Sequence, residues 1–218
     1  MREQRQQQQH QLGIKQRERN NRGYKFFVFF IIIKLPSLAL VQCQGYLSEQ
    51  LMSLLANAER RSVASVRHLL ERGADVNFQC RNNTTALTYI ASASYMVEYV
   101  QLLLEYGASL QVRTLSKGKT ALIKAVEGGA VNVVQILLKN GATVDEIDGN
   151  GRTALVYAVE KKALEIAELF IDHGANVNVK NHKGISIVQL ATKQQDEDMV
   201  RLLTINNTKQ QQQQQQQR

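Results

Sequence analysis

One short phrase recurs at nearly constant spacing, and this recurrence constrains the fold more than any other feature of the chain. The phrase joins an apolar run to Gly-Ala, as in "LLKNGATVDEI" at residues 137–147. The four Gly-Ala pairs lie 34, 34 and 33 residues apart and begin at Gly73, Gly107, Gly141 and Gly174. A second phrase keeps the same period: "TAL" begins at Thr85, Thr120 and Thr153, and "SIV" begins at Ser186. Two markers with one period indicate a repeat protein.

The pattern inside one unit predicts two short helices followed by an extended turn. Leu122, Ala125 and Val126 share one face of the first helix. The second apolar run, residues 131–138, ends near Gly141, a residue suited to the left-handed backbone that closes helices. A unit of about 33 residues buries too little apolar surface to fold alone, so neighbouring units have to stack. The sequence therefore predicts an all-α solenoid.

The period, the phrase "T-A-L-x-x-A" and the phrase "V-x-x-L-L-x-x-G-A-x-V" resemble the ankyrin repeat. The resemblance implies stacked helix-turn-helix units with short β-hairpin-like fingers between them. It covers residues 47–204, which divide into five repeats at 47–79, 80–114, 115–147, 148–180 and 181–204. The first and last repeats depart from the pattern, and we expect them to act as caps.

One departure from the family pattern concerns the start of the first helices. The His of the usual "T-P-L-H" phrase is replaced in each repeat that carries the phrase, by Thr88, Ile123, Val156 and Gln189. Because the resemblance implies hydrogen bonds from that His, we expect this stack to be less stable than one with the full phrase.

Repeat 2 is irregular. It holds one extra residue near "SASY" and another in "VRTLSKGK". Tyr95, Tyr99, Leu102 and Tyr106 share one side of its expected second helix. Two interpretations remain open: this side packs against an adjacent repeat, or it forms a tyrosine-rich contact patch.

Gln-rich segments flank the predicted repeat domain. Residues 1–25 form a basic, Gln-rich tail, and residues 205–218 form a poly-Gln tail; both are expected to be disordered because they have little apolar surface to bury. The net charge of +8 lies mostly in these ends, since residues 1–25 carry seven Lys or Arg against two Glu. Nucleic-acid association is therefore not expected for the repeats and remains a minor hypothesis for the basic tail.

Residues 26–46 form an apolar segment. Its most apolar part, residues 26–41, is interrupted by Lys34 and Pro36 and is shorter than the roughly 20 residues that span a bilayer. If residues 26–43 act as a signal, the protein is secreted or membrane-associated. A membrane-surface anchor through residues 26–41 and a locally packed extension also remain open. The cysteine-poor repeat domain favours the cytoplasm.

The chain lacks the residue patterns of common enzymes. Two cysteines, Cys43 and Cys80, cannot build a disulfide framework, and no His or Cys stands near them at metal-ligand spacing. No H-E-x-x-H motif, phosphate loop or Ser-His-Asp arrangement occurs. The sequence predicts that the protein is not an enzyme and needs no cofactor or metal.

By its resemblance to ankyrin repeats, the domain is expected to bind another protein, as a monomeric interaction module or scaffold. The concave surface of fingers and first helices is the expected contact. Its candidate residues are Arg81, Asn82, Thr84, Lys117, Lys119, Glu127, Asn150, Arg152, Glu160, Lys161, Lys180, His182 and Lys183. Five of them, Lys117, Lys119, Arg152, Lys180 and Lys183, are basic residues expected along one edge, which favours an acidic partner segment. The competing interpretation is that each is simply a solvated polar residue.

Overall fold

The structure is a computed structural model that describes residues 36–56, 62–181 and 183–216. It divides into two compact units, residues 1–47 and 48–218. The predicted basic tail at 1–25 lies outside the described residues, as do residues 26–35 of the apolar segment. The last part of that segment belongs to α2 (Pro36–Ala56). Within the described ranges, no helix is both long enough and apolar enough to cross a membrane.

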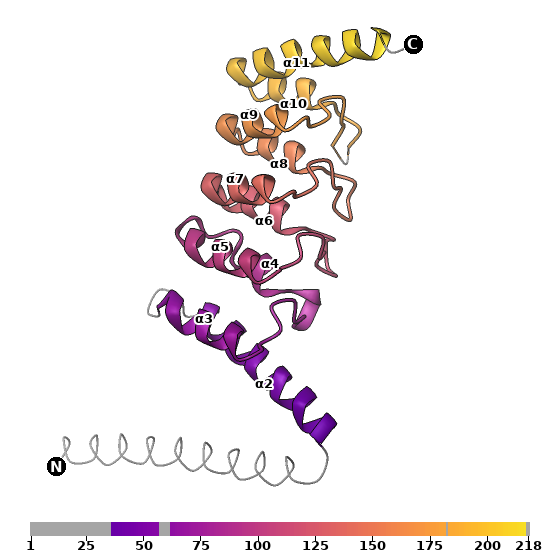
Figure 1. Cartoon of the computed structure of the whole chain (residues 1–218). Helices are drawn as coiled ribbons and strands as arrows, with labels where there is room; N and C mark the ends of the chain where they lie inside the picture. Colours follow the sequence, from indigo (N-terminus) through magenta and orange to yellow (C-terminus); the bar gives the residue numbers. More distant parts are fainter. Residues whose placement is uncertain (1–35, 57–61, 182, 217–218) are drawn as a thin grey trace, which may run out of the picture. The chain divides into compact units, whose positions relative to one another are not determined.

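The second unit is built from helix pairs that stack in chain order (Figure 1). The first helices of the pairs are α4 (Ala86–Ile90), α6 (Ala121–Gly128), α8 (Ala154–Glu160) and α10 (Ile187–Lys193). The second helices of these pairs are α5 (Val97–Glu105), α7 (Val131–Lys139), α9 (Leu164–Asp172) and α11 (Glu197–Gln216). An additional second helix, α3 (Val63–Glu71), precedes the four pairs. Each helix packs on its counterpart in the next pair, so the first helices form one layer and the second helices another. This arrangement confirms the predicted all-α solenoid.

The core lies between the two layers and is made mainly of aliphatic side chains. Leu122, Ala125 and Val126 are buried as predicted, whereas Val131 in the second apolar run is only half-buried. Ile123 and Leu155 from the first helices are fully buried, and so are Leu137, Ile166 and Phe170 from the second helices. Burying one such side chain contributes about 1.5–3 kcal/mol, and each does so only because the next pair covers it.

Hydroxyl side chains start the first helices. The Oγ1 atoms of Thr120 and Thr153 accept hydrogen bonds from the backbone N–H three residues later. Thr85 and Ser186 form capping boxes, in which the residues at the family's His position take part: Thr88 Oγ1 accepts from Thr85 N at 2.9 Å, and Gln189 Oε1 accepts from Ser186 N at 3.2 Å. In these two repeats, the side chain at the family's His position therefore makes a hydrogen bond at the start of the helix.

The end of α6 requires two adjacent glycines for different reasons. Gly129 has φ +66° and closes the helix in the left-handed region. A Cβ atom at Gly128 would lie 1.9 Å from the carbonyl oxygen of Ser92, which belongs to the preceding helix pair. Glycine at 128 thus permits the close approach of neighbouring repeats.

In the irregular second repeat, the extra residue near "SASY" falls at a 3-10 turn, η3 (Ser94–Met96), between α4 and α5. The tyrosine-bearing side of α5 divides: Tyr99 and Leu102 are buried, whereas Tyr95 precedes the helix and is 63% exposed. Tyr106, the fourth member of this side, is half-buried. Tyr99 and Leu102 therefore pack within the stack, as the first interpretation expected, and Tyr95 does not.

The connections that precede the first helices are hairpin-like turns, and the described residues contain no named strand. They include η2 (Arg81–Asn83) and the isolated antiparallel bridges Cys80↔Thr84 and Lys180↔Ser186. Comparable backbone bonds close the other two turns: Thr114 N donates to Lys119 O, and Asp148 N donates to Arg152 O.

The C-terminal end differs from the expected disordered tail. α11 continues as a helix through residue 216, past the predicted end of the fifth repeat. Glutamine is a good helix former. In addition, Gln210 Nε2 donates to Ala175 O at 2.8 Å, and Gln210 Oε1 accepts from Val177 N at 3.2 Å. These contacts attach the start of the Gln tract to the preceding repeat.

Candidate partner-binding surface

The hairpin-like turns lie at the N-terminal ends of the first helices, and we call them fingers 2, 3, 4 and 5 (residues 80–84, 114–119, 148–152 and 181–185). Backbone bonds join neighbouring fingers. Leu115 N donates to Asn82 O at 3.0 Å, and Gly149 N donates to Lys117 O at 2.8 Å. The side chain of Asn82 adds two bonds to Ser116. Fingers 2 to 4 are therefore positioned relative to one another by their main chain.

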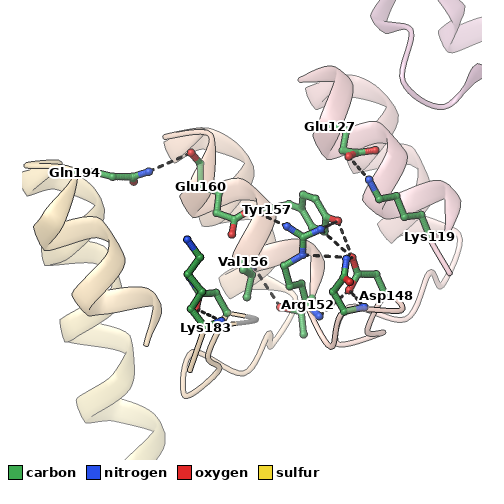
Figure 2. A network of polar contacts seen from close by, with 12 residues as sticks. Lys119, Glu127, Asp148, Arg152, Val156, Tyr157, Glu160, Lys183 and Gln194 are labelled. Atoms are coloured by element: carbon green, nitrogen blue, oxygen red, sulfur yellow. Dashed lines mark hydrogen bonds and ion pairs between the residues drawn. The ribbon is translucent and has the colours of Figure 1, made fainter. Parts of the chain in front are cut away.

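The side chain of Asp148 binds the backbone of finger 4 and is buried beneath it (Figure 2). Its carboxylate has no exposed surface. Oδ1 accepts from Asn150 N at 2.8 Å and from Arg152 N at 2.9 Å, which folds the finger around the carboxylate. Oδ2 accepts from Tyr157 Oη at 2.7 Å and from Arg152 Nη2 at 3.2 Å. Burial raises the pKa of Asp148, but these hydrogen bonds and the guanidinium outweigh it and hold the pKa below its usual value.

Tyr157 on α8 lies between two cations. The Arg152 guanidinium carbon is 4.3 Å from the ring centroid, and Lys119 Nζ is 5.1 Å from it. Arg152 also donates to the Tyr157 hydroxyl oxygen. Burial, together with the hydrogen bond to Asp148, raises the pKa of Tyr157 well above its usual value, so the hydroxyl stays protonated and donates to the carboxylate.

Each of the two cations also pairs with a glutamate on a first helix. Lys119 Nζ pairs with Glu127 Oε1 on α6, and Arg152 Nη1 lies 3.4 Å from Glu160 Oε2 on α8. Lys124 approaches Glu127 as well, at 3.6 Å. Burial raises the pKa of Glu127, but the hydrogen bond and charge of Lys119 outweigh it, and the pKa is lowered.

The structure places the predicted contact residues in three groups. Asn82, Lys117, Asn150, Lys161, Lys180 and Lys183 are exposed. Thr84, Glu127, Arg152 and Glu160 are half-buried, and Lys119 is buried. The side chain of Arg81 and the whole of His182 lie outside what the structure describes. Of the five cations predicted to line one edge, Lys119 and Arg152 are thus held in internal ion pairs, while Lys117, Lys180 and Lys183 present free charge to solvent.

Sequence reasoning missed Asp148 and Tyr157, which hold the centre of this network. Asp148 was visible as the first residue of "DGNGR", a typical turn in which an Asp side chain bonds the backbone two residues later. Tyr157 carried no such signal, because its contacts join a finger, a first helix and the neighbouring repeat. Among the described residues, no group of His, Cys, Asp and Glu could hold a metal ion.

Comparison with known proteins agrees with this architecture. The family model described as ankyrin repeats, in three copies, matches residues 53–148 and 140–215. An ankyrin repeat protein of fowlpox virus (strain NVSL) is 38% identical over 105 residues, which cover 47% of this chain and 30% of the viral protein. An ankyrin repeat and KH domain-containing protein of Caenorhabditis elegans is 34% identical over 104 residues, covering 47% of this chain and 4% of that protein.

The B-cell lymphoma 3 protein homolog of Mus musculus is 37% identical over 91 residues, covering 40% of this chain and 20% of the mouse protein. The chain therefore spans less than a third of the length of each of these relatives. The match of the family model, by contrast, extends over more than half of the chain and over all the stacked helix pairs from α4 to α11. The chain belongs to the ankyrin repeat family.

Proposed function

We propose that this protein is a non-catalytic interaction module that binds a partner protein through its fingers and the adjoining face of its first helices. Ankyrin repeats generally mediate protein–protein interaction. The observation that carries the proposal for this chain is the row of finger residues Asn82, Lys117, Asn150 and Lys183. Each stands three residues before the residue that caps a first helix, and each is exposed.

The charges of this row favour an acidic partner segment. Lys117 and Lys183 occupy equivalent places in fingers 3 and 5, and Lys180 precedes finger 5. At the other end of the first helices, exposed Lys161 follows α8 and exposed Lys193 ends α10. A carboxylate-bearing segment lying along the first helices would therefore meet positive charge at both edges, which favours its encounter and orientation.

The experiment compares the full chain with two triple variants in affinity capture from cell extract. The finger variant carries Lys117→Glu, Lys180→Glu and Lys183→Glu. The control carries Arg72→Glu, Lys139→Glu and Lys209→Glu, which change the net charge equally at exposed positions outside the fingers and first helices. We expect proteins retained by the wild type and the control to be lost with the finger variant. Equal retention by all three forms would contradict the proposed surface.

A further inference from the structure

Two ion pairs occupy equivalent positions in neighbouring repeats. Lys119 and Arg152 each precede the threonine that caps a first helix, and each pairs with a glutamate eight residues later, Glu127 or Glu160. The side chain of each glutamate is 26% exposed, whereas those of Lys119 and Arg152 are 9% and 15% exposed. In both pairs, the glutamate side chain is therefore more exposed than the side chain of the cation. Figure 2 shows the two pairs.

Arg152 does not depend on Glu160 for its position. Its Nη2 and Nε lie 3.2 Å and 3.4 Å from Asp148 Oδ2, and its guanidinium rests on the Tyr157 ring. Only Nη1 pairs with Glu160. If Glu160 moved away, the guanidinium would stay in place with one nitrogen open to another acceptor. Such a cation is already ordered, which reduces the entropy lost when a new carboxylate binds.

The environment of Lys119 resembles that of Arg152. Its Nζ is near the same Tyr157 ring as Arg152, so the two cations and the ring form one cluster, Lys119–Tyr157–Arg152. Glu127 is also within 3.6 Å of Lys124, which could keep the displaced carboxylate nearby. The glutamates are the more exposed members of both pairs, and a carboxylate that replaces one of them keeps the cation paired throughout, so no buried charge is left without a partner.

We propose, on the basis of the proposed function, that Glu127 and Glu160 compete with the partner's carboxylates for the two cations. Two carboxylates of an acidic partner segment displace them and pair with Lys119 and Arg152. The two cations come from adjacent repeats but lie against the same Tyr157 ring, with Lys119 Nζ 5.1 Å and the Arg152 guanidinium carbon 4.3 Å from its centroid, so one short segment can reach both. A polyproline II segment with an acidic residue at every third position presents its carboxylates on one face, about 9.3 Å apart along its axis, and the acidic side chains can converge on the two cations.

The test uses a fluorescein-labelled (Glu-Pro-Pro)₅ peptide, with (Gln-Pro-Pro)₅ as the uncharged peptide, and measures binding to the full chain by fluorescence anisotropy. Glu127→Gln and Glu160→Gln remove the competing charges and preserve side-chain size. The matched control is Glu165→Gln with Glu168→Gln, two exposed glutamates on the second helix α9.

We expect affinity for the acidic peptide to rise about threefold in each single variant and about tenfold in the double variant, as loss of competition from partly exposed pairs allows. The control should change affinity less than twofold, because its charges lie on the other helix layer and are screened by salt. Circular dichroism verifies that each variant retains the wild-type helix content, and a single variant suffices if the double one does not fold.

Two results would overturn the displacement. One is unchanged affinity in the folded Glu127→Gln and Glu160→Gln variants; the other is an equal increase in the α9 control. The finger variant with Lys117→Glu, Lys180→Glu and Lys183→Glu separates this inference from the proposed function. If that variant loses the peptide while the Gln variants gain nothing, only the displacement fails. If it binds the peptide as the wild type does, the acidic-partner surface itself fails.

Discussion

Asp148 shows how one buried carboxylate can set the geometry of a finger. All its oxygen contacts come from the same finger or from Tyr157 on the following helix. The negative charge is needed because both a guanidinium and a tyrosine hydroxyl point at Oδ2. Replacing the carboxylate by an amide would put an NH2 group, which is a donor, in the place of Oδ2. That group would face the guanidinium and the tyrosine hydroxyl, which are also donors, at a place that water does not reach.

Asp148→Asn is therefore expected to lower the free energy of unfolding by about 2–3 kcal/mol. Urea unfolding followed by circular dichroism at pH 7 measures this change. Asp172→Asn at an exposed position at the end of α9 serves as the control and should change stability by less than about 0.5 kcal/mol. Equal effects of the two substitutions would show that the network does not support the finger.

The same residue predicts a pH dependence. Because folding lowers the pKa of Asp148 below its usual value of 3.8, its contribution is present above that value and is lost as the pH falls through the folded-state pKa. The stability difference between wild type and Asp148→Asn should therefore shrink between about pH 5 and pH 2, a range set by ordinary carboxyl titration. Urea titrations at several pH values test this, and a difference that stays constant would contradict it.

Gly128 and Gly129 allow two structural requirements for glycine to be compared: close approach of a neighbouring backbone at Gly128 and a left-handed backbone at Gly129. Gly128→Ala is expected to cost about 3 kcal/mol, because its Cβ would collide with the Ser92 carbonyl of the adjacent repeat. Gly129→Ala should cost about 1 kcal/mol, because its Cβ meets open space and only the left-handed backbone is unfavourable. Thermal unfolding of both variants gives the order, and a larger effect at Gly129 would refute the close approach.

At the scale of elements, the first helices differ in how they begin. α4 and α10 have capping boxes completed by Thr88 and Gln189, whereas α6 and α8 have only the single bond from Thr120 or Thr153. The apolar Ile123 and Val156 at the equivalent positions cannot accept a hydrogen bond. These two helices are held instead by core packing, since both side chains are fully buried.

Thr88→Val should therefore destabilise the protein by about 1–2 kcal/mol, because the buried Thr85 N–H loses its acceptor. Thr192→Val is the matched control: the Thr192 hydroxyl donates to Val188 O at an exposed site, and its loss should cost less than about 0.5 kcal/mol. Chemical denaturation of the two variants provides the measurement. If Thr88→Val were as mild as the control, the capping box would not contribute.

At the scale of the whole molecule, every helix pair relies on its neighbours, and the last pair relies on its own C-terminal extension. The α11 helix reaches back through Gln210 to the backbone of Ala175 and Val177. These side-chain bonds join the C-terminal part of α11 to the loop that follows α9. The family model also reaches residue 215, beyond the predicted end of the repeats at residue 204.

Gln210→Ala should increase hydrogen exchange at the Val177 amide and reduce the free energy of unfolding by about 1 kcal/mol. Gln212→Ala, at an exposed position in the same tract, should change neither quantity. Amide exchange measured by NMR on the full chain resolves the two variants. Equal protection of the Val177 amide in both variants would mean that Gln210 does not stabilise the loop at Val177.

The sequence by itself determined the repeat, its helix pairs and the apolar positions of the core, because periodicity and capping residues act over a few positions along the chain. Gly141 carries such a local signal, and its φ of +85° lies in the left-handed region that its position predicts. Only the tertiary structure decided which finger cations remain free. Lys117 and Lys119 stand two positions apart with the same charge, yet one faces solvent and the other is buried against Glu127 and Tyr157. Lys119 is buried because it meets Glu127 eight residues later and the Tyr157 ring of the next repeat, and the alternation of apolar and polar residues does not show which side chains meet across such separations.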